Sequence, residues 1–321
     1  MNTSAEPTGE IVIQIDGLTK DYEVGFLKKK TVHALDHLSL KVYRGEIFGF
    51  LGPNGAGKTT TLKLLMRLIY PTRGSARILG LPFEDATTRS RVGYLPENPY
   101  FYDYLSGREL LGYTGALFGL SRSQIADRAP NLLATVGLDD ERADRQLRKY
   151  SKGMLQRIGI AQALINDPEI LFLDEPMSGL DPVGRREIRD LLLTLREQGK
   201  TIFFSSHILS DVEALCDRAA ILSRGRLLRS GTIVEMTGEE TTALEVVAAG
   251  VAGESIDSIS RALPQIREVT ATPNGVHFII EDESRIDDAL RLIREAGGKL
   301  VSVNSRRRSL EDVFSRTEQG I

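Results

Sequence analysis

The fold is decided at residues 52–60, Gly52-Pro53-Asn54-Gly55-Ala56-Gly57-Lys58-Thr59-Thr60, which fit the pattern G-x-x-x-x-G-K-S/T at every position. An apolar run at 46–51 precedes them and an apolar helical pattern at 60–66 follows, and strand, glycine loop and helix form the context that this pattern requires. Glycines let backbone N–H groups converge on an anion at a helix N-terminus. We therefore expect all nine residues to line a nucleoside triphosphate, with Lys58 at the β- and γ-phosphates and the Thr59 hydroxyl on Mg²⁺. The alternative, a glycine-rich turn without a ligand, fits the flanks less well.

A second motif lies far downstream, where the apolar run Ile170-Leu171-Phe172-Leu173 ends in Asp174-Glu175-Pro176. A continuous apolar run is typical of a central parallel strand, and open α/β sheets place their ligands at the carboxyl ends of such strands. We expect Asp174 to join the Mg²⁺ shell and Glu175 to take a proton from the attacking water or to orient it. The alternative is a helix-capping carboxylate beside a surface acid.

Three further motifs complete an ordered series: Ser151-Lys152-Gly153-Met154-Leu155-Gln156-Arg157, Ser178-Gly179-Leu180-Asp181, and an isolated His207 after a strand. The series resembles the nucleotide-binding subunit of ABC transporters over roughly residues 10–235. The family signature is Leu-Ser-Gly-Gly-Gln, and this chain has Tyr-Ser-Lys-Gly-Met at residues 150–154. This variant resembles the one found in bacterial exporters with separate membrane subunits.

The resemblance implies roles for the signature and for His207. Ser151, Lys152 and Gly153 complete the nucleotide site of a second copy, which gives a homodimer with two ATP molecules between the subunits. His207 contacts the γ-phosphate as a catalytic residue beside Lys58 and Glu175. The alternative for His207 is a helix N-terminal residue or a satisfied core group.

Two more residues take their roles from the resemblance. Glu97, in Gly93-Tyr94-Leu95-Pro96-Glu97, stands where the family usually has Gln, and is expected to meet Mg²⁺ and to link the γ-phosphate to the membrane partner. Tyr22 stands where the family stacks an aromatic ring on adenine. The alternative for Glu97 is an exposed loop acid, and the alternative for Tyr22 is an ordinary half-buried strand tyrosine.

Four aromatic residues fall within Pro99-Tyr100-Phe101-Tyr102-Asp103-Tyr104. Such a cluster forms either local core or a docking surface. Because it follows Glu97 directly, we favour a groove that receives a short helix of the membrane partner.

The composition fits a cytosolic enzyme. With 321 residues, 41% hydrophobic and 26% charged, the chain can bury a full core and form more than one domain. Its single cysteine excludes a disulfide framework, and no apolar stretch approaches the about 20 residues of a spanning helix. If this chain acts at a membrane, another chain must supply the membrane part, and the resemblance to ABC transporters implies a separate multi-pass transmembrane permease as that partner, with this chain at the cytoplasmic face of the membrane. The net charge of −3 gives no basic field for nucleic acid.

The expected fold class is α/β, a P-loop NTPase core of the ABC ATPase type with an antiparallel β subdomain and a helical insert. The nucleotide-binding domain is expected over residues 10–235, with the insert at about 98–165 and βα alternation over 166–235. Residues 240–321 are expected to form a small α+β, ferredoxin-like accessory domain of order βαββαβ, including a helix over 256–263 and a turn at Pro273-Asn274-Gly275. This domain offers no acid pair or glycine loop, which indicates packing or regulation.

Two other classes fit less well. A soluble ABC-type ATPase that acts on DNA or ribosomes usually carries a long coiled coil or two cassettes in one chain, and neither pattern is present. A P-loop kinase would not need Ser151-Lys152-Gly153. The sequence therefore favours an ATPase that powers transport, and the resemblance to bacterial exporters implies the export direction.

Overall fold

The computed structural model describes residues 9–25, 30–238, 243–251, 266–272, 275–280, 282–306, 309–311 and 313–314. The chain divides into two compact units, Met1–Ile233 and Val234–Ile321. The described strands of the first unit are β1 (Ile11–Val24), β2 (Lys30–Tyr43), β3 (Ile47–Leu51), β4 (Arg73–Ile78), β5 (Leu81–Pro82), β6 (Val92–Leu95), β7 (Ile170–Asp174), β8 (Thr201–Ser206), β9 (Arg218–Ser223) and β10 (Arg226–Thr232). Its described helices are α1 (Lys58–Leu65), α2 (Gly107–Leu117), α3 (Arg122–Thr135), α4 (Asp140–Ala143), α5 (Lys152–Leu164), α6 (Pro182–Glu197) and α7 (Leu209–Leu215), with short 3-10 helices η1 (Ala86–Arg91) and η2 (Leu147–Lys149).

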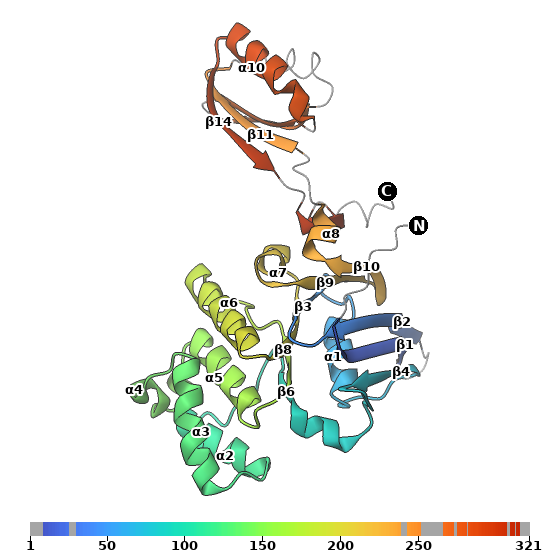
Figure 1. The fold of residues 1–321 in the computed structure, drawn as a ribbon, viewed down its shortest axis with the longest axis vertical. Helices are drawn as coiled ribbons and strands as arrows, with labels where there is room; N and C mark the ends of the chain where they lie inside the picture. The colour runs from blue at the N-terminus through green and yellow to red at the C-terminus, as the bar shows by residue number, and fades with distance from the viewer. Residues whose placement is uncertain are drawn as a thin grey trace. The chain divides into compact units, whose positions relative to one another are not determined.

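Six strands form the central sheet, in the order β10-β9-β3-β8-β7-β6. Neighbours pair in parallel, except β9 and β10. Every residue of β3, β7 and β8 is buried, as expected for strands covered on both faces. In Figure 1, α5 and α6 lie on one side of this sheet and α1 lies on the other. The prediction of a buried parallel sheet is confirmed.

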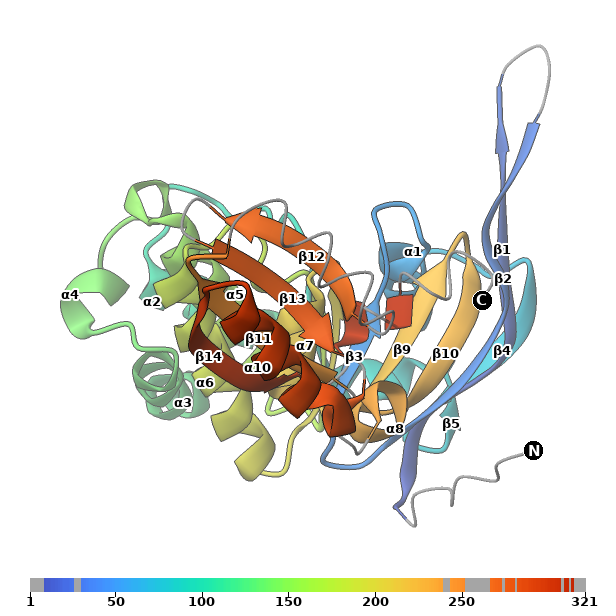
Figure 2. The same ribbon diagram turned by 90° about the horizontal axis from the view of Figure 1, so that it is seen from above.

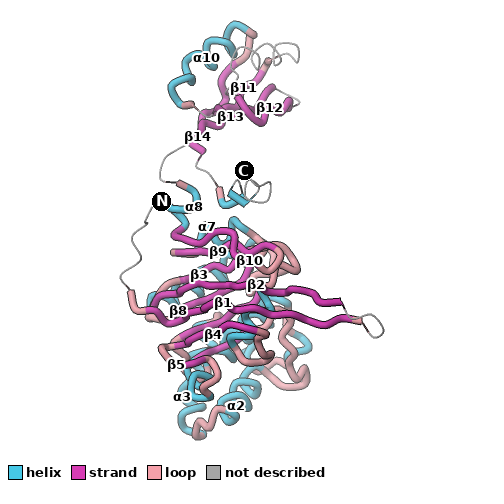
Figure 3. The backbone as a smooth tube through the Cα atoms, turned by 90° about the vertical axis from the view of Figure 1, so that its right-hand side faces the viewer, coloured by secondary structure: helices cyan, strands magenta, loops and turns pink. Residues whose placement is uncertain are grey.

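A second, antiparallel sheet has the order β2-β1-β4-β5. One hydrophobic core joins it to α1 and to the parallel sheet, and includes Val12, Leu62 and Phe50 from these three layers. Beyond this core, β1 and β2 project together as a two-stranded ribbon (Figures 2 and 3). Tyr22 lies on this ribbon and is 36% exposed.

The chain between β6 and β7 carries α2 to α5, and the sequence explains where three of these helices begin. Ser106 and Ser121 form capping boxes with Glu109 and Gln124 at the starts of α2 and α3, and Ser151 caps α5. Each serine oxygen accepts a hydrogen bond from a backbone N–H that has no partner inside the helix.

The aromatic run at residues 99–104 forms a loop before α2, and its side chains divide into two sets. The Phe101 ring packs on α5, where its Cζ lies 3.3 Å from the position of a Cβ on Gly159. By contrast, Tyr100, Tyr102 and Tyr104 are exposed. The run therefore presents one half-buried ring and three exposed rings, and its role as a docking groove stays a prediction.

The second unit begins with α8 (Ile233–Thr237) and contains β11 (Ala243–Ala249), β12 (Ile266–Thr272), β13 (Gly275–Ile280), α10 (Ile286–Glu295) and β14 (Lys299–Arg306). Its antiparallel sheet has the order β12-β13-β11-β14. Side chains of the sheet such as Val246 and Phe278 share a core with Ala289 and Ile293 of α10. The expected helix over 256–263 and the first two residues of the expected turn, Pro273 and Asn274, lie outside the described residues.

No helix in the described part of the chain combines the length and the apolar character that a membrane span requires.

Removing one ring from the central sheet tests this packing. Phe203 of β8 contacts three other rings, with centroid distances of 5.5 Å to Phe48, 5.2 Å to Phe50 and 5.8 Å to Phe172. We expect Phe203→Ala to destabilise the protein by about 3–5 kcal/mol, because it leaves a cavity in a close-packed core. Urea unfolding followed by circular dichroism measures the change, with Val183→Ala at a 65% exposed position as the control. Equal unfolding midpoints for the two variants would contradict this account.

Candidate active site at the edge of the parallel sheet

The phosphate loop follows the buried strand β3, and its backbone geometry requires glycine at residue 57. Gly57 is the N-cap of α1 with a φ of 110°, and a Cβ there would lie 2.6 Å from the carbonyl oxygen of Ala34. No side chain caps α1, and its first turn contains no acidic residue. The first N–H groups of α1 are therefore open to an anion, and the helix dipole favours negative charge at this end.

Lys58 lies at the start of α1 and is 6% exposed. Its Nζ donates hydrogen bonds to the carbonyl oxygens of Gly52 at 2.7 Å and Pro53 at 3.3 Å, and lies 3.3 Å from Oε1 of Glu175. The ammonium is thus enclosed by oxygen acceptors inside the phosphate loop. Such a buried cation needs negative partners, and phosphate oxygens are the strong acceptors that suit it.

Glu175 links the phosphate loop to the end of β8. Its other oxygen, Oε2, lies 2.8 Å from Nδ1 of His207, while the carboxylate is almost fully buried. An ionised carboxylate only accepts hydrogen bonds, so in this pair Nδ1 carries the proton. Glu175 has a φ of 51°, a left-handed conformation that is rare for a residue with a side chain and clusters at functional sites.

Asp174 is 1% exposed and is held by two hydroxyl groups. Its Oδ1 accepts hydrogen bonds from Thr59 Oγ1 at 3.2 Å and Ser205 Oγ at 2.6 Å, whereas its Oδ2 has no hydrogen-bond partner. Burial raises the pKa of this carboxyl group, and the hydrogen bonds from Ser205 and Thr59 act in the opposite direction. A buried carboxylate oxygen without a partner is costly unless a cation or an ordered water meets it.

Sequence motifs that lie more than a hundred residues apart therefore meet in one network of side chains: Lys58, Thr59, Asp174, Glu175 and His207. The parallel pairing of β3, β8 and β7 brings them together, because it aligns the carboxyl ends of these strands. The sequence did not single out Ser205. Its available signal was two serines at the end of a strand that is otherwise mostly apolar.

Other expected site residues lie outside this network. Ser151 caps α5 and is exposed, and the ammonium of Lys152 lies over the backbone of Gly179, 2.1 Å from the position of a Cβ on that residue. Glu97 is exposed in the loop after β6 and makes no hydrogen bond or ion pair with a described residue. On the β1–β2 ribbon, the Lys20 ammonium lies 4.9 Å from the ring centroid of Tyr22.

The fold and this network define a P-loop ATPase. A family model described as "ABC transporter" matches residues 35–178. An uncharacterised ABC transporter ATP-binding protein of Synechocystis is 47% identical, over 97% of this chain and 86% of that protein. A Nod factor export ATP-binding protein of Cupriavidus metallidurans is 38% identical, over 87% of this chain and 90% of that protein. The chain belongs to the family of ABC transporter ATP-binding proteins.

The similarity to solved structures agrees with this assignment. A dimeric ATP-binding cassette in a post-hydrolysis state, bound to ADP and Pi, is 26% identical with a TM-score of 0.63, and the match covers 68% of this chain and 98% of that one. The predicted resemblance and the predicted class, an ATPase with a mixed α/β fold, are confirmed.

Replacing Lys58 tests the phosphate loop. We expect Lys58→Ala to weaken ATP binding by at least about tenfold, because a hydrogen bond to a charged group contributes about 1.5–3 kcal/mol. Equilibrium dialysis with labelled ATP measures the affinity. Lys63→Ala, at an exposed position of the same helix, is the matched control and should bind as the wild type does. Unchanged affinity in a folded Lys58→Ala protein would argue against this role.

Proposed function

We propose that this chain hydrolyses ATP as one of two identical subunits that power an exporter, at the cytoplasmic face of a membrane, through a separate multi-pass permease. The observation that carries the proposal is the contact of the buried Glu175 carboxylate with both Lys58 and His207. A basic loop for phosphate, a carboxylate and a histidine at one point supply the parts that phosphoryl transfer to water needs. The direction of transport is supported by the relative named for Nod factor export.

The reaction follows from the position of each group. The phosphate loop, Gly52 to Thr60, binds the phosphates through backbone N–H groups and through Lys58, whose ammonium leaves Glu175 for the γ-phosphate. Glu175 then orients the attacking water or takes its proton. His207 holds the Glu175 carboxylate in place through Nδ1, and its Nε2 makes no hydrogen bond with a described residue, so it is available to the γ-phosphate.

The residues present fit Mg²⁺. The partnerless Oδ2 of Asp174 and the hydroxyl of Thr59 supply hard oxygen ligands, directly or through water. The described residues contain no cluster of three or more acidic, histidine or cysteine side chains that could hold a metal. Such a sparse site suits a cation that shares its shell with substrate phosphates and neutralises their charge. Glu97 is assigned to the same shell by the resemblance to the ABC family, in which this position meets the metal.

The second copy is supported by the N-terminus of α5. Ser151 and Lys152 are both exposed there, and the first turn of this helix contains no acidic residue. A lysine at the positive end of a helix dipole is unfavourable in isolation but favourable beside an anion. With Gly153, this end suits the phosphates of an ATP bound to the partner copy, and Tyr22 suits adenine within its own copy. A two-fold axis would make both sites equivalent.

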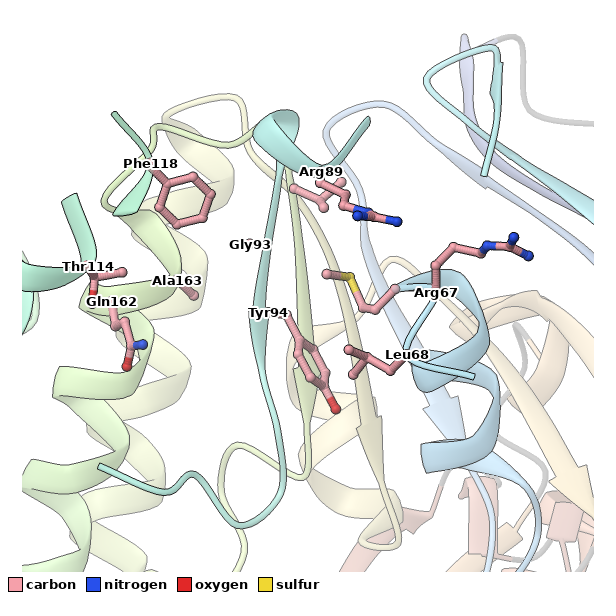
Figure 4. Close-up of a pocket in the computed structure, with 11 residues that line it drawn as sticks. Arg67, Leu68, Arg89, Gly93, Tyr94, Thr114, Phe118, Gln162 and Ala163 are labelled. Atoms are coloured by element: carbon pink, nitrogen blue, oxygen red, sulfur yellow. The ribbon is translucent and has the colours of Figure 1, made fainter. Parts of the chain in front are cut away.

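The permease is expected to dock at a cavity of about 450 Å³ on the first unit. The cavity is surrounded by five parts of the chain: the segment that follows α1, and the elements η1, β6, α2 and α5 (Figure 4). Its lining includes Leu68, Tyr94 and Phe118. Leu68 is 59% exposed and Phe118 is 44% exposed, and Leu117 beside them is 69% exposed. Apolar side chains gathered around a hollow mark an interaction site. This cavity replaces the aromatic run as the centre of the proposed docking surface.

Tyr94 gives the cavity a physical link to the catalytic end of the sheet. Burial, together with the negative charge of Asp174, raises the pKa of Tyr94 to about 12. Tyr94 belongs to β6, which pairs with β7 on one side. β6 also packs so closely on α5 that a Cβ on Gly93 would clash with the Ala163 carbonyl oxygen. A shift of β6 would therefore displace both β7 and α5.

The Glu175→Gln variant tests the chemistry. We expect it to bind ATP but to hydrolyse it about 10²–10⁴-fold more slowly, because the amide keeps the shape and cannot accept a proton. Light scattering should show more dimer with ATP than without, since bound ATP would join the two copies. Glu141→Gln, an exposed change on α4, is the control. Wild-type hydrolysis, or no ATP-dependent dimer at any protein concentration, would refute the assignment.

The Leu68→Glu variant tests the docking cavity. We expect membrane binding of the tagged chain to weaken by about 2 kcal/mol, or about thirtyfold, if Leu68 anchors the centre of the interface. The basal ATPase activity of the purified subunit should stay unchanged. Co-sedimentation with membranes of the expressing cells measures the binding, and Val301→Glu on the second unit, at a 63% exposed position, is the control. Full membrane binding by Leu68→Glu would exclude this cavity.

A further inference from the structure

The hydroxyl group of Ser205 joins the two acidic residues of the site. Ser205 is fully buried and is the second-last residue of β8. Its Oγ lies 2.6 Å from Oδ1 of Asp174 and 3.0 Å from the backbone nitrogen of Glu175. One side chain therefore contacts two consecutive residues at the end of the neighbouring strand, and β8 delivers His207 only two residues later.

The direction of both hydrogen bonds follows from the groups involved. A backbone N–H only donates, so Ser205 Oγ accepts the hydrogen bond from Glu175. The single proton of the hydroxyl is then donated to Asp174, whose oxygen accepts it. A donor to a carboxylate makes a shorter and stronger hydrogen bond than a neutral pair makes, which agrees with the 2.6 Å distance.

On the Asp174 side, this bond selects which oxygen remains available. Ser205 and Thr59 both donate to Oδ1, and Oδ2 is left without a partner. The Thr59 bond is longer, at 3.2 Å. Thr59 is also the proposed metal ligand, so its hydroxyl would bind Mg²⁺ as well as Asp174. Ser205 is therefore the donor that holds the Asp174 carboxylate in one orientation.

On the Glu175 side, the bond holds the backbone. The φ of 51° at Glu175 persists only where neighbouring groups hold it. Its N–H is bound by Ser205, and its carbonyl oxygen accepts a hydrogen bond from the Ser178 N–H at 3.0 Å. In this conformation the Glu175 side chain contacts both Lys58 and His207.

We propose that Ser205 is a positioning residue for ATP hydrolysis: its hydroxyl orients Asp174 toward Mg²⁺ and fixes the backbone from which Glu175 reaches the water. The proposal rests on the proposed roles of Asp174 and Glu175. Ser205 itself touches neither substrate nor metal.

A purely structural role for a buried hydroxyl is the competing explanation, and the same strand offers a matched control. Thr201 is also fully buried on β8, and its Oγ1 accepts a hydrogen bond from the Gly45 N–H at 2.9 Å. It lies at the opposite end of the strand from the site. Thr201→Val and Ser205→Ala each remove one buried hydroxyl that accepts a backbone N–H, so both test the cost in stability, and only Ser205→Ala tests positioning.

The experiment compares these two variants in three measurements. The first is the ATP dissociation constant in EDTA and in excess Mg²⁺, the second is kcat at saturating MgATP, and the third is the melting temperature. For Ser205→Ala we expect unchanged affinity in EDTA, a smaller gain in affinity when Mg²⁺ is added, and a kcat about tenfold to a hundredfold lower. For Thr201→Val we expect a lower melting temperature, with kcat and the Mg²⁺ gain as in the wild type.

Two results would overturn the proposal. One is a folded Ser205→Ala protein with the wild-type kcat and the wild-type increase in ATP affinity on adding Mg²⁺. The other is a Thr201→Val protein that loses as much of kcat and of this increase as Ser205→Ala does. If Ser205→Ala does not fold, Ser205→Cys replaces it, since the thiol fills the site with a weaker donor. A loss larger than that of Thr201→Val then supports positioning, and an equal loss rejects it. The proposed function would fail separately, if Glu175→Gln hydrolysed ATP at the full rate. In that case the increase in ATP affinity on adding Mg²⁺ would still test the link between Ser205 and Asp174.

Discussion

The parallel pairing of β3, β8 and β7 is the constraint on which the candidate site depends. In this register Leu51 lies opposite Ser206, and Asp174 lies opposite Ser205. The phosphate loop, the acid pair and His207 therefore leave the sheet at one edge. Because strand side chains alternate between faces, a slip of one residue would turn Ser205 away from Asp174. The burial of all three strands makes such a slip costly, so the hydrophobic core also maintains the geometry of the chemistry.

Prediction from sequence succeeded for the buried strands of the central sheet, where the information is local. The phosphate loop lies within nine residues, and the apolar runs before Gly52, Asp174 and His207 indicate buried strands directly. The role of Ser205 depends on which strand lies beside β8, and no local pattern contains that pairing. The aromatic run shows a different limit. Spacing does not tell which rings point inward, so it could not separate Phe101, which packs on α5, from the exposed Tyr102.

The signature segment differs from the rest of the site, because the chain's own pairing does not bring it to the phosphate loop. Its proposed role requires a second copy. The lysine at residue 152 changes the electrostatics of that contact, since an uncharged signature would present only the helix dipole and the Ser151 hydroxyl. The Lys152 ammonium lies over Gly179, in the segment that follows Glu175. Within one copy, the signature and the segment after the acid pair are therefore neighbours in the fold.

The strand β6 then gives a route by which hydrolysis could reach a partner. It pairs with β7, which ends at Asp174, and its Gly93 fits directly against α5. Tyr94 faces the docking cavity while the charge of Asp174 acts on its phenol. Its pairing with β7 and its close packing on α5 leave β6 little freedom to move alone, because interiors of this density transmit displacement. A ligand in the cavity can bias the catalytic end only if it binds two arrangements of β6 with different affinity. Gly93 sets the spacing between β6 and α5, because any side chain there would meet the Ala163 carbonyl oxygen and force the strand away from the helix.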